Sequence, residues 1–532
     1  MRPMRTRLTL AALPTLASIV LSFPQLKTAE TPPASKLVVD LDRITVATVG
    51  PISITASEFK SGYEFGPAFP KRESRSKERY LNYLVYEKLL ALDARQRGLD
   101  IWPDLRRQVS EIQGDLATEE LYRDDILKGV KPGARLIADA VGRERRHLSV
   151  RWIFCSSAPE VDSVVRAMKS GATFDSLYSE QIAGKVKPDD RSMETTAFRL
   201  RLKNPAFASV TESLKPGAVS LPVHGPDGWY FVQITKSWTS PVGTQSENER
   251  ILADVRRSLT QYAADSLSDA YVGHLMTGEH PTIMRGPFNA IEAYLGAKFL
   301  DKKTMEEWKL SARMGAKNLR DPSDIESIAP ETLVVMKSRT ISVGDFLGWF
   351  RMREPYVKME LSRQEGFFQS AENLVWQMVR DRLLTQRAYE RGYQNRASVK
   401  RETEWWREKM LYIANKQRIG DTIEDSTSSL MKFYGSHERL FADDSGHVRP
   451  FADVREDVWK QYYSSELTKR MLHEILRLKQ QYRVRVDSTA LQAVAVSEEN
   501  DPKAIDVYSV KSRGIYPRMA FPSIDYDWVT WE

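Results

Sequence analysis

RHLSVRWIFC, residues 146–155, opens the stretch Arg146–Trp238, which decides the fold of this part of the chain. Its β-branched and aromatic residues form an apolar run that is typical of a strand. Apolar residues at helical spacing then predict a helix over 161–168, which ends at Ser170-Gly171, and a second helix begins at Thr173. A strand followed by two helices predicts a small domain that contains both kinds of element.

The second half of this stretch predicts a short helix, tight turns and a hairpin. The helix runs from Asn204 to Leu214, and a Lys-Pro-Gly turn follows at 215–217. A hairpin then turns at 225–228 and returns as the strand 229–234. We therefore expect an α+β domain in which an antiparallel sheet is surrounded by helices.

This order of elements resembles the parvulin family of peptidyl-prolyl isomerases. The resemblance covers the whole stretch, and it depends on the order and spacing of several short motifs. They are Arg146-His147-Leu148 for the family's Arg-His-Ile-Leu, Gly171-Ala172-Thr173-Phe174 for its Gly-x-x-Phe, Phe207 seven residues before Leu214, Leu214-Lys215-Pro216-Gly217-Ala218-Val219-Ser220 for its Leu-Lys-Pro-Gly-x-Val-Ser, and Asp227-Gly228-Trp229-Tyr230 for its terminal Gly-x-His.

A parvulin rotates the amide bond before a proline, for which the uncatalysed barrier is about 18–20 kcal/mol. No bond is broken, so the site needs only a dry apolar cup for the proline ring and a few polar groups that favour the twisted amide. The resemblance implies catalytic roles for Phe207 in the cup, for His147 as the retained histidine, and for Tyr230. It also implies that substrate is bound by Leu202, Phe198, Thr195 and Asp227.

Two departures from the family leave a second interpretation open. Tyr230 stands where the family has its second histidine, and residues 192–196 replace its Gly-Gly-Asp-Leu-Gly segment. His147 can equally be a strand histidine that is satisfied by a neighbouring hydroxyl group. The alternative to an isomerase is therefore a non-catalytic module that binds peptide.

The N-terminal segment and the composition of the chain indicate the compartment of the protein and the kinds of partner it binds. A basic head followed by the apolar run Leu8–Phe23 predicts a secretory signal, with a membrane anchor as the alternative. The 78 basic residues are interleaved with 71 acidic ones, which argues against a nucleic-acid partner. The single cysteine, Cys155, is expected to be structural, and the scattered histidines predict no metal site and no cofactor.

An internal repeat frames the parvulin-like stretch. Two short strands and a helix around Phe59 recur around Phe346, and the long helices that follow both stop at a glycine, Gly98 and Gly392. This frame resembles the helical chaperone body of the SurA, PpiD and PrsA group, here duplicated. The expected division is a signal peptide or anchor at 1–35, a helical segment at 36–145, the parvulin-like domain at 146–238, a helical segment completing the first module at 239–325, a second module at 326–486 and a tail at 487–532.

Together these features predict a mostly helical, duplicated α+β protein of the periplasm or another extracytoplasmic compartment. The first hypothesis is an exported foldase, an isomerase and chaperone whose partners are unfolded chains containing X-Pro bonds. The alternative is a non-catalytic chaperone or scaffold whose degenerate parvulin-like domain binds peptides. In both, the N-terminal segment could associate with the membrane.

Overall fold

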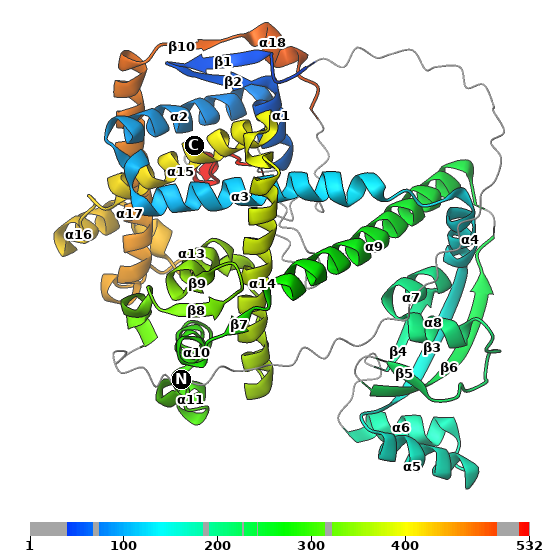
Figure 1. Cartoon of the computed structure of the whole chain (residues 1–532). Coiled ribbons are helices and arrows are strands. Elements are labelled where there is room, and N and C mark those ends of the chain that lie inside the picture. The colour runs from blue at the N-terminus through cyan, green and yellow to red at the C-terminus, as the bar shows by residue number, and fades with distance from the viewer. Residues whose placement is uncertain are drawn as a thin grey trace, which may run out of the picture. The chain divides into compact units, whose positions relative to one another are not determined.

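The chain forms two compact units in this computed structural model (Figure 1). One unit is Tyr122–Tyr271, and the other combines the residues up to Leu121 with those from Val272 onward. The structure describes residues 40–66, 74–184, 191–225, 228–241, 243–313, 322–496 and 521–530. The expected signal at 1–35 lies outside these ranges, and none of the helices within them is both long and apolar enough to cross a bilayer.

The smaller unit contains a four-stranded antiparallel sheet of order β4-β3-β6-β5. Helices α7 and α8 pack on one face of this sheet, and α5 and α6 pack on the other. In chain order its elements are η3 (Leu127–Gly129), α4 (Ala134–Arg145), β3 (Arg146–Cys155), α5 (Ala158–Lys169), α6 (Phe174–Gly184), β4 (Ser192–Thr196), α7 (Ala197–Lys203), α8 (Pro205–Thr211), β5 (Val223–Gly225), β6 (Gly228–Thr239) and most of α9 (Gln245–Glu279).

The larger unit is mostly helical and holds two small antiparallel sheets. Before the smaller unit, the chain contributes β1 (Thr45–Val49), β2 (Ile52–Thr55), α1 (Ala56–Phe65), α2 (Ser76–Gln96), η2 (Leu99–Ile101) and α3 (Pro103–Asp125). After it come β7 (Thr282–Ile283), α10 (Arg285–Phe299), α11 (Lys302–Glu307), α12 (Leu310–Arg313), η5 (Pro322–Ile328), β8 (Thr332–Val335), β9 (Thr340–Ser342), α13 (Val343–Arg353), η6 (Glu354–Tyr356), α14 (Gln364–Glu390), η7 (Tyr393–Asn395), α15 (Ala397–Gly420), α16 (Thr427–Ser436), η8 (Glu438–Phe441), α17 (Phe451–Gln481), β10 (Val484–Val486), α18 (Ser488–Ala493) and α19 (Asp527–Thr530).

The same order of elements occurs twice in the larger unit. A hairpin, a short helix, a long helix, a 3₁₀ turn and another helix follow one another in β1 to α3 and again in β8 to α15, where the extra 3₁₀ turn η6 separates the short helix from the long one. The side-chain oxygens of Thr55 and Ser342 cap the two short helices by accepting hydrogen bonds from backbone N–H groups. Gly98 and Gly392 follow the long helices with φ of +76° and +74°, a left-handed conformation that glycine adopts without strain.

Each small sheet of the larger unit is completed by a strand from outside its own hairpin. Strand β10, near the end of the chain, pairs with β1 and completes the first sheet, whereas β7 pairs with β8 and completes the second (Figure 1). The sequence expectation had 239–325 completing the module begun by 36–145, but β7 of that range belongs to the second sheet. Strand pairing is made by backbone hydrogen bonds, which are the same for every residue, so short strands carry little signal about their partners.

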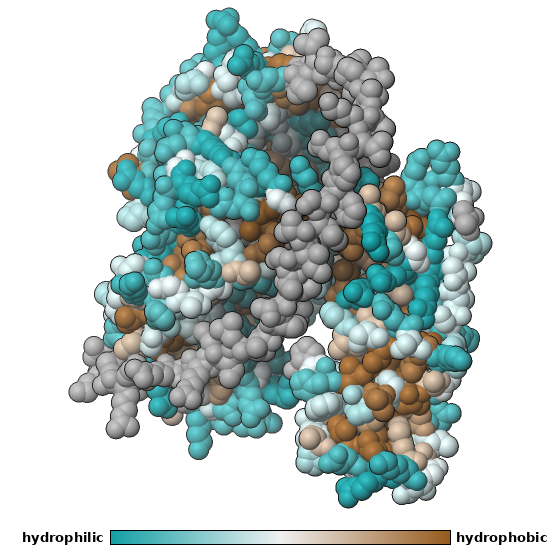
Figure 2. Space-filling view, turned by 45° about the vertical axis from the view of Figure 1, so that its right-hand side comes forward, coloured by the Kyte–Doolittle hydropathy of each residue, from teal (hydrophilic) through white to brown (hydrophobic). Residues whose placement is uncertain are grey.

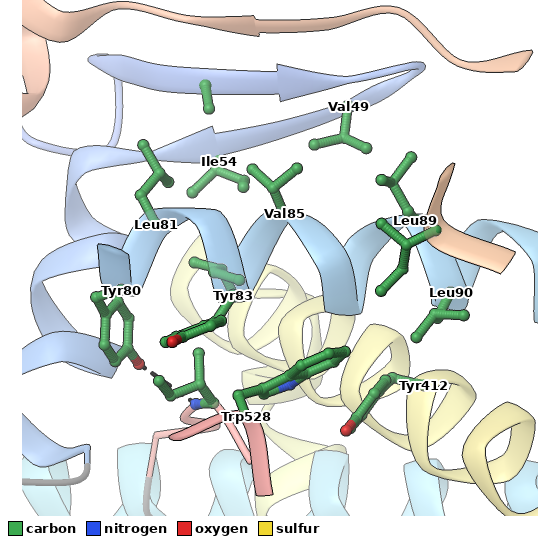
Figure 3. Packing of buried hydrophobic residues seen from close by; sticks show 14 of the residues in the cluster. Val49, Ile54, Tyr80, Leu81, Tyr83, Val85, Leu89, Leu90, Tyr412 and Trp528 are labelled. Carbon is green, nitrogen blue, oxygen red and sulfur yellow. Dashed lines mark hydrogen bonds between the residues drawn. The ribbon is translucent and has the colours of Figure 1, made fainter. Parts of the chain in front are cut away.

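Helices α2 and α15 form the centre of the first core, with strands β1 and β2 above them (Figure 3). Within this core lies an ion cluster: the Lys88 ammonium group on α2 contacts the carboxylates of Glu58 on α1 and Glu408 on α15. All three side chains are buried. A second buried cluster joins α3 to α13, where the Arg353 guanidinium group donates to both carboxylate oxygens of Asp115 at 2.8 and 2.9 Å.

Candidate functional site

The register of the four-stranded sheet determines which residues can form a site. Strand β3 lies between β4 and β6, and Phe154 is opposite Tyr230. Side chains alternate along a strand, so Trp152 and Phe154 point to the face covered by α7 and α8, while Ile153 and Cys155 point to the face covered by α5 and α6.

An aromatic cluster fills the face under α8. The Phe207 ring meets the rings of Trp152 and Tyr230 edge-on, with centroid distances of 5.5 and 4.8 Å. Tyr230 also contacts Phe154 at 5.2 Å. Asn204 caps α8 by accepting a hydrogen bond from the Phe207 N–H, and this cap directs Phe207 towards the sheet. The Phe207 side chain is only 2% exposed, so these rings form packed core rather than the wall of an open cup.

Gly228 places Tyr230 against Phe154. Gly228 is the first residue of β6 and has a φ of +154°. A Cβ at this position would lie 2.6 Å from both the Cys155 carbonyl oxygen and the Phe154 ring. Only glycine allows the two strands to approach this closely.

Gly228→Ala is therefore expected to destabilise the smaller unit by more than about 1 kcal/mol, because the added methyl group meets strained backbone and an aromatic ring. Urea unfolding followed by tryptophan fluorescence measures the change. Gly129→Ala is the matched control, because a Cβ there meets nothing within 4 Å. Equal midpoints for the two variants would contradict this reading of Gly228.

His147 lies away from the aromatic cluster. It is opposite Trp238 on β6, seven residues along β3 from Phe154, a distance of roughly 23 Å at the usual rise of a strand. Its ring stacks on Trp238 with centroids 5.2 Å apart, and its Nε2 is 2.7 Å from the Ser240 hydroxyl oxygen. The structure thus brings Phe207 and Tyr230 together but leaves His147 outside, in the arrangement expected for a histidine satisfied by a hydroxyl group.

The residues expected to bind substrate are also dispersed. Phe198 is buried and Leu202 partly buried in a cluster with residues of α4 and α9, which is separate from the cluster that contains Phe207. Thr195 is half-buried on β4, opposite Leu148 of β3. Asp227 lies outside the described residues. These positions separate because a short helix turns neighbouring side chains towards different partners, which the spacing of motifs in a sequence does not show.

Trp152, like Phe154, is a residue of this cluster that the sequence alone did not single out. It occupies the position on β3 from which a side chain reaches Phe207, five residues along the strand from His147. The signal for it was the alternation of the strand itself, since Leu148, Val150 and Trp152 must share one face.

The opposite face of the sheet, under α5 and α6, holds the chain's single cysteine in an apolar cluster. Cys155 packs there with Phe174 and Phe231, and burial raises the pKa of its thiol, which is typical of a cysteine with a structural role. A hollow between β3, α5 and α6 is lined by Ile153, Ser163, Val164, Ala167, Leu177, Glu180 and Gln181. Figure 2 shows apolar side chains gathered on this unit at the height of α5 and α6.

Comparisons with known proteins give weak likenesses to solved structures. No protein-family model and no curated protein matches the chain. A structure of the peptidylprolyl isomerase PrsA from Bacillus anthracis is 14% identical, covers 36% of this chain and 97% of its own, and has a TM-score of 0.21. One from work on PEB4 and Cj1289, SurA-like chaperones of Campylobacter jejuni, is 17% identical over 44% of this chain and 97% of its own, with a TM-score of 0.20. PrsA from Bacillus subtilis is 16% identical over 43% and 93%, with a TM-score of 0.16. At such TM-scores, any function has to rest on the residues of this chain.

Proposed function

We propose that this chain is an exported chaperone that holds extended polypeptides, and that its parvulin-like unit serves recognition rather than isomerisation. The observation that carries this proposal is the burial of Phe207, which is 2% exposed beneath Trp152 and Tyr230. A proline ring needs an open apolar cup, and a Phe207 ring packed against Trp152 and Tyr230 offers it no exposed wall.

The polar groups of the unit favour the same proposal. An isomerase has to present polar groups to the amide that twists, close to the proline cup. His147 is the histidine that the family resemblance implied, and it is engaged with Ser240 and Trp238 far along β3. Tyr230 faces the cup position, but its ring packs into the cluster with Phe154 and Phe207.

The holding activity is expected to reside in apolar side chains exposed on long helices. On α17, Leu472 and Leu476 are one turn apart and 40% and 64% exposed, while neighbouring Met471 and Ile475 are buried in the core. On α9, Tyr262 and Leu267 are each 48% exposed. Exposed apolar side chains of this kind are typical of surfaces that bind other chains.

The test is aggregation of a denatured client diluted from urea, followed by light scattering. An equimolar amount of this chain is expected to suppress the scattering, and Leu472→Ser/Leu476→Ser to suppress it less. Thr468→Ser, a conservative change at a half-buried position on the same helix, is the control. Scattering equal to that of the client alone would refute the proposal.

Isomerase activity is the second candidate, favoured by the contact of Phe207 with Tyr230 and by the partly buried side chains of Met193, Val210 and Leu214 that pack against this cluster. A rotation of Tyr230 would open a cup among these side chains. Under the main proposal, the full chain leaves the relaxation of an X-Pro peptide at its uncatalysed rate, tens of seconds or slower, as measured by exchange NMR. Faster relaxation with the chain would establish the second candidate instead, provided that Phe207→Leu removes the acceleration. Ser209→Ala, an exposed change on the same helix, is the control and should preserve it.

The proposal also includes a duplicated helical module and export of the chain. The repeated order of hairpin, helix, long helix, turn and helix is what duplication of one module would give, with the parvulin-like unit placed after the first copy. The basic and apolar N-terminal segment supports export to an extracytoplasmic compartment, with membrane attachment as the alternative.

A further inference from the structure

The last described residues, 521–530, lie on a surface made by α1, α2 and α15. Trp528 is 2% exposed, and Figure 3 shows it between Tyr83 of α2 and Tyr412 of α15. Its ring centroid lies 6.1 Å from that of Tyr83, in a stacked arrangement, and 6.1 Å from that of Tyr412. Ile524, four residues earlier, is 3% exposed. The segment thus has two buried apolar anchors four residues apart, Ile524 before α19 and Trp528 within it.

Polar side chains of α2 and α15 bind individual groups of this segment. We call the part of the larger unit that precedes residue 497 the body. The Glu87 carboxylate on α2 accepts hydrogen bonds from the Asp525 backbone N–H at 2.7 Å and from the Trp528 indole N–H at 3.0 Å. The Lys416 ammonium group on α15 contacts the carboxylates of Asp525 and Asp527 at 2.6 and 2.5 Å. The Tyr412 hydroxyl donates to Asp525 at 3.0 Å. Each carboxylate of the segment thus meets a cation of the body, and the Glu87 carboxylate of the body meets N–H groups of the segment.

The surface is shaped to admit a backbone. A Cβ on Gly66, at the end of α1, would lie 2.3 Å from the Ser523 hydroxyl oxygen, so this edge of the surface is open because a side chain is absent. The Ser523 hydroxyl donates to the Gly62 carbonyl oxygen at 3.1 Å, and the Ile524 N–H donates to the Tyr80 hydroxyl at 3.4 Å. Phe65 and Phe521 stack at the same end, with centroids 5.4 Å apart.

The rest of the body is built from residues that precede 497. Strand β10 already completes the first sheet, and α1, α2 and α15 all lie earlier in the chain. Segment 521–530 therefore adds to this surface as a ligand adds to a receptor, with residues 497–520 as its connection in the sequence.

We infer that the surface of α1, α2 and α15 is a binding site for acidic, aromatic peptide segments, and that the chain's own C-terminal segment occupies it in cis. A suitable ligand carries an aliphatic residue, two carboxylates for Lys416 and a tryptophan for the Tyr83–Tyr412 slot. Because the chain's own segment is tethered, its effective concentration is on the order of millimolar, and it holds the site closed to weaker ligands of the same chemistry.

The test uses the full chain with a protease recognition site placed within 505–512, and a fluorescent peptide of residues 519–532. After cleavage the peptide is expected to exchange into the site, and its anisotropy gives a binding curve. The intact chain is expected to bind the peptide at least roughly 100-fold more weakly, because the tethered segment competes.

Peptide variants test the recognition itself. The Trp528→Ala peptide is expected to bind roughly 100-fold or more weakly, since an indole leaves its slot. The Asp525→Asn/Asp527→Asn peptide is expected to lose roughly tenfold, since its contacts with Lys416 lose their charge. The Tyr526→Ala peptide is the control, because Tyr526 is 64% exposed.

Three outcomes would overturn the inference: no exchange into the cleaved chain, an equal loss for the Tyr526→Ala and Trp528→Ala peptides, or dimers that form with rising concentration and disappear on cleavage. The last would make a second copy the source of the segment. If cleavage unfolds the body, as judged by circular dichroism, the intact Trp528→Ala chain is used instead. It is expected to bind the unaltered peptide, and failure to do so would equally refute the site.

Discussion

Replacing Lys88 with methionine is expected to lower the free energy of unfolding of the larger unit by about 3–5 kcal/mol at pH 8, because two buried carboxylates lose their shared cation. The Lys88 side chain is 4% exposed, and those of Glu58 and Glu408 are 5% and 7% exposed. Water therefore cannot replace the ammonium group. The measurement is urea unfolding followed by circular dichroism.

The dependence of this effect on pH identifies its cause. Burial, together with the neighbouring Glu408, raises the pKa of Glu58 to about 7 although Lys88 opposes the shift. In the unfolded chain this pKa is near 4.5, so between about pH 4.5 and 7 the folded state binds more protons than the unfolded state, and this group's contribution to stability falls as the pH rises. A protonated carboxyl group needs no cation, so Lys88→Met is expected to cost less at pH 5 than at pH 8.

Two further variants check the prediction for Lys88. The triple change Glu58→Gln/Lys88→Met/Glu408→Gln removes all the charges together and is expected to recover most of the lost stability. Lys460→Met removes an exposed lysine of α17 that pairs with Glu456, and it is expected to leave the urea midpoint unchanged. A Lys88→Met variant as stable as Lys460→Met at pH 8 would show that the buried ion cluster is not maintained in solution.

Arg353→Met is expected to cost a similar amount, about 3–5 kcal/mol, and to weaken two distant parts of the sequence at once. The Arg353 side chain is 1% exposed, donates to both oxygens of Asp115 on α3, and lies over the Trp349 ring at 4.9 Å. Its Nε is 3.5 Å from the Asp381 carboxylate on α14, which also accepts from the Trp349 indole at 2.8 Å. Loss of the guanidinium group removes the cation that these two carboxylates share, although Asp381 keeps its pair with Arg380 at 2.7 Å.

Hydrogen exchange followed by mass spectrometry measures where stability is lost. Because the ion cluster joins α3 to α13 and α14, Arg353→Met is expected to speed exchange in all three helices. Arg351→Met is the matched control: Arg351 lies on the same helix, is 46% exposed and pairs with Glu326 at the surface. Faster exchange in α13 alone would mean that the two halves of the larger unit are stabilised independently.

Local sequence signals predicted many elements of the fold. The β-branched and aromatic run of 146–155 and the glycines that end the two long helices, Gly98 and Gly392, both act on neighbours in the chain. For the same reason, the repeated order of elements around Phe59 and Phe346 could be recognised without coordinates. The structure is mostly helical with small antiparallel sheets, as expected.

The candidate site was only partly accessible from the sequence. Phe207 and Tyr230 were singled out, and they do meet, at 4.8 Å. Trp152, their third partner, was missed because the motif comparison pointed to His147 at the other end of the same strand. Motif matching ranks residues by type, whereas a site is defined by the register of two strands and the helix above them.

By itself, the amino-acid sequence indicated the strand at 146–155, the helices that follow it, the hairpin at 225–228 and the repeated hairpins and helices around Phe59 and Phe346, because these depend on residues a few positions apart. Only the tertiary structure decided which strand completes which sheet, that Phe207 is covered, and that the C-terminal tryptophan lies between Tyr83 and Tyr412. Each of these depends on contacts between residues tens to hundreds of positions apart. Backbone pairing and apolar burial are favourable with many partners, so the partner that is chosen emerges only when the whole chain packs.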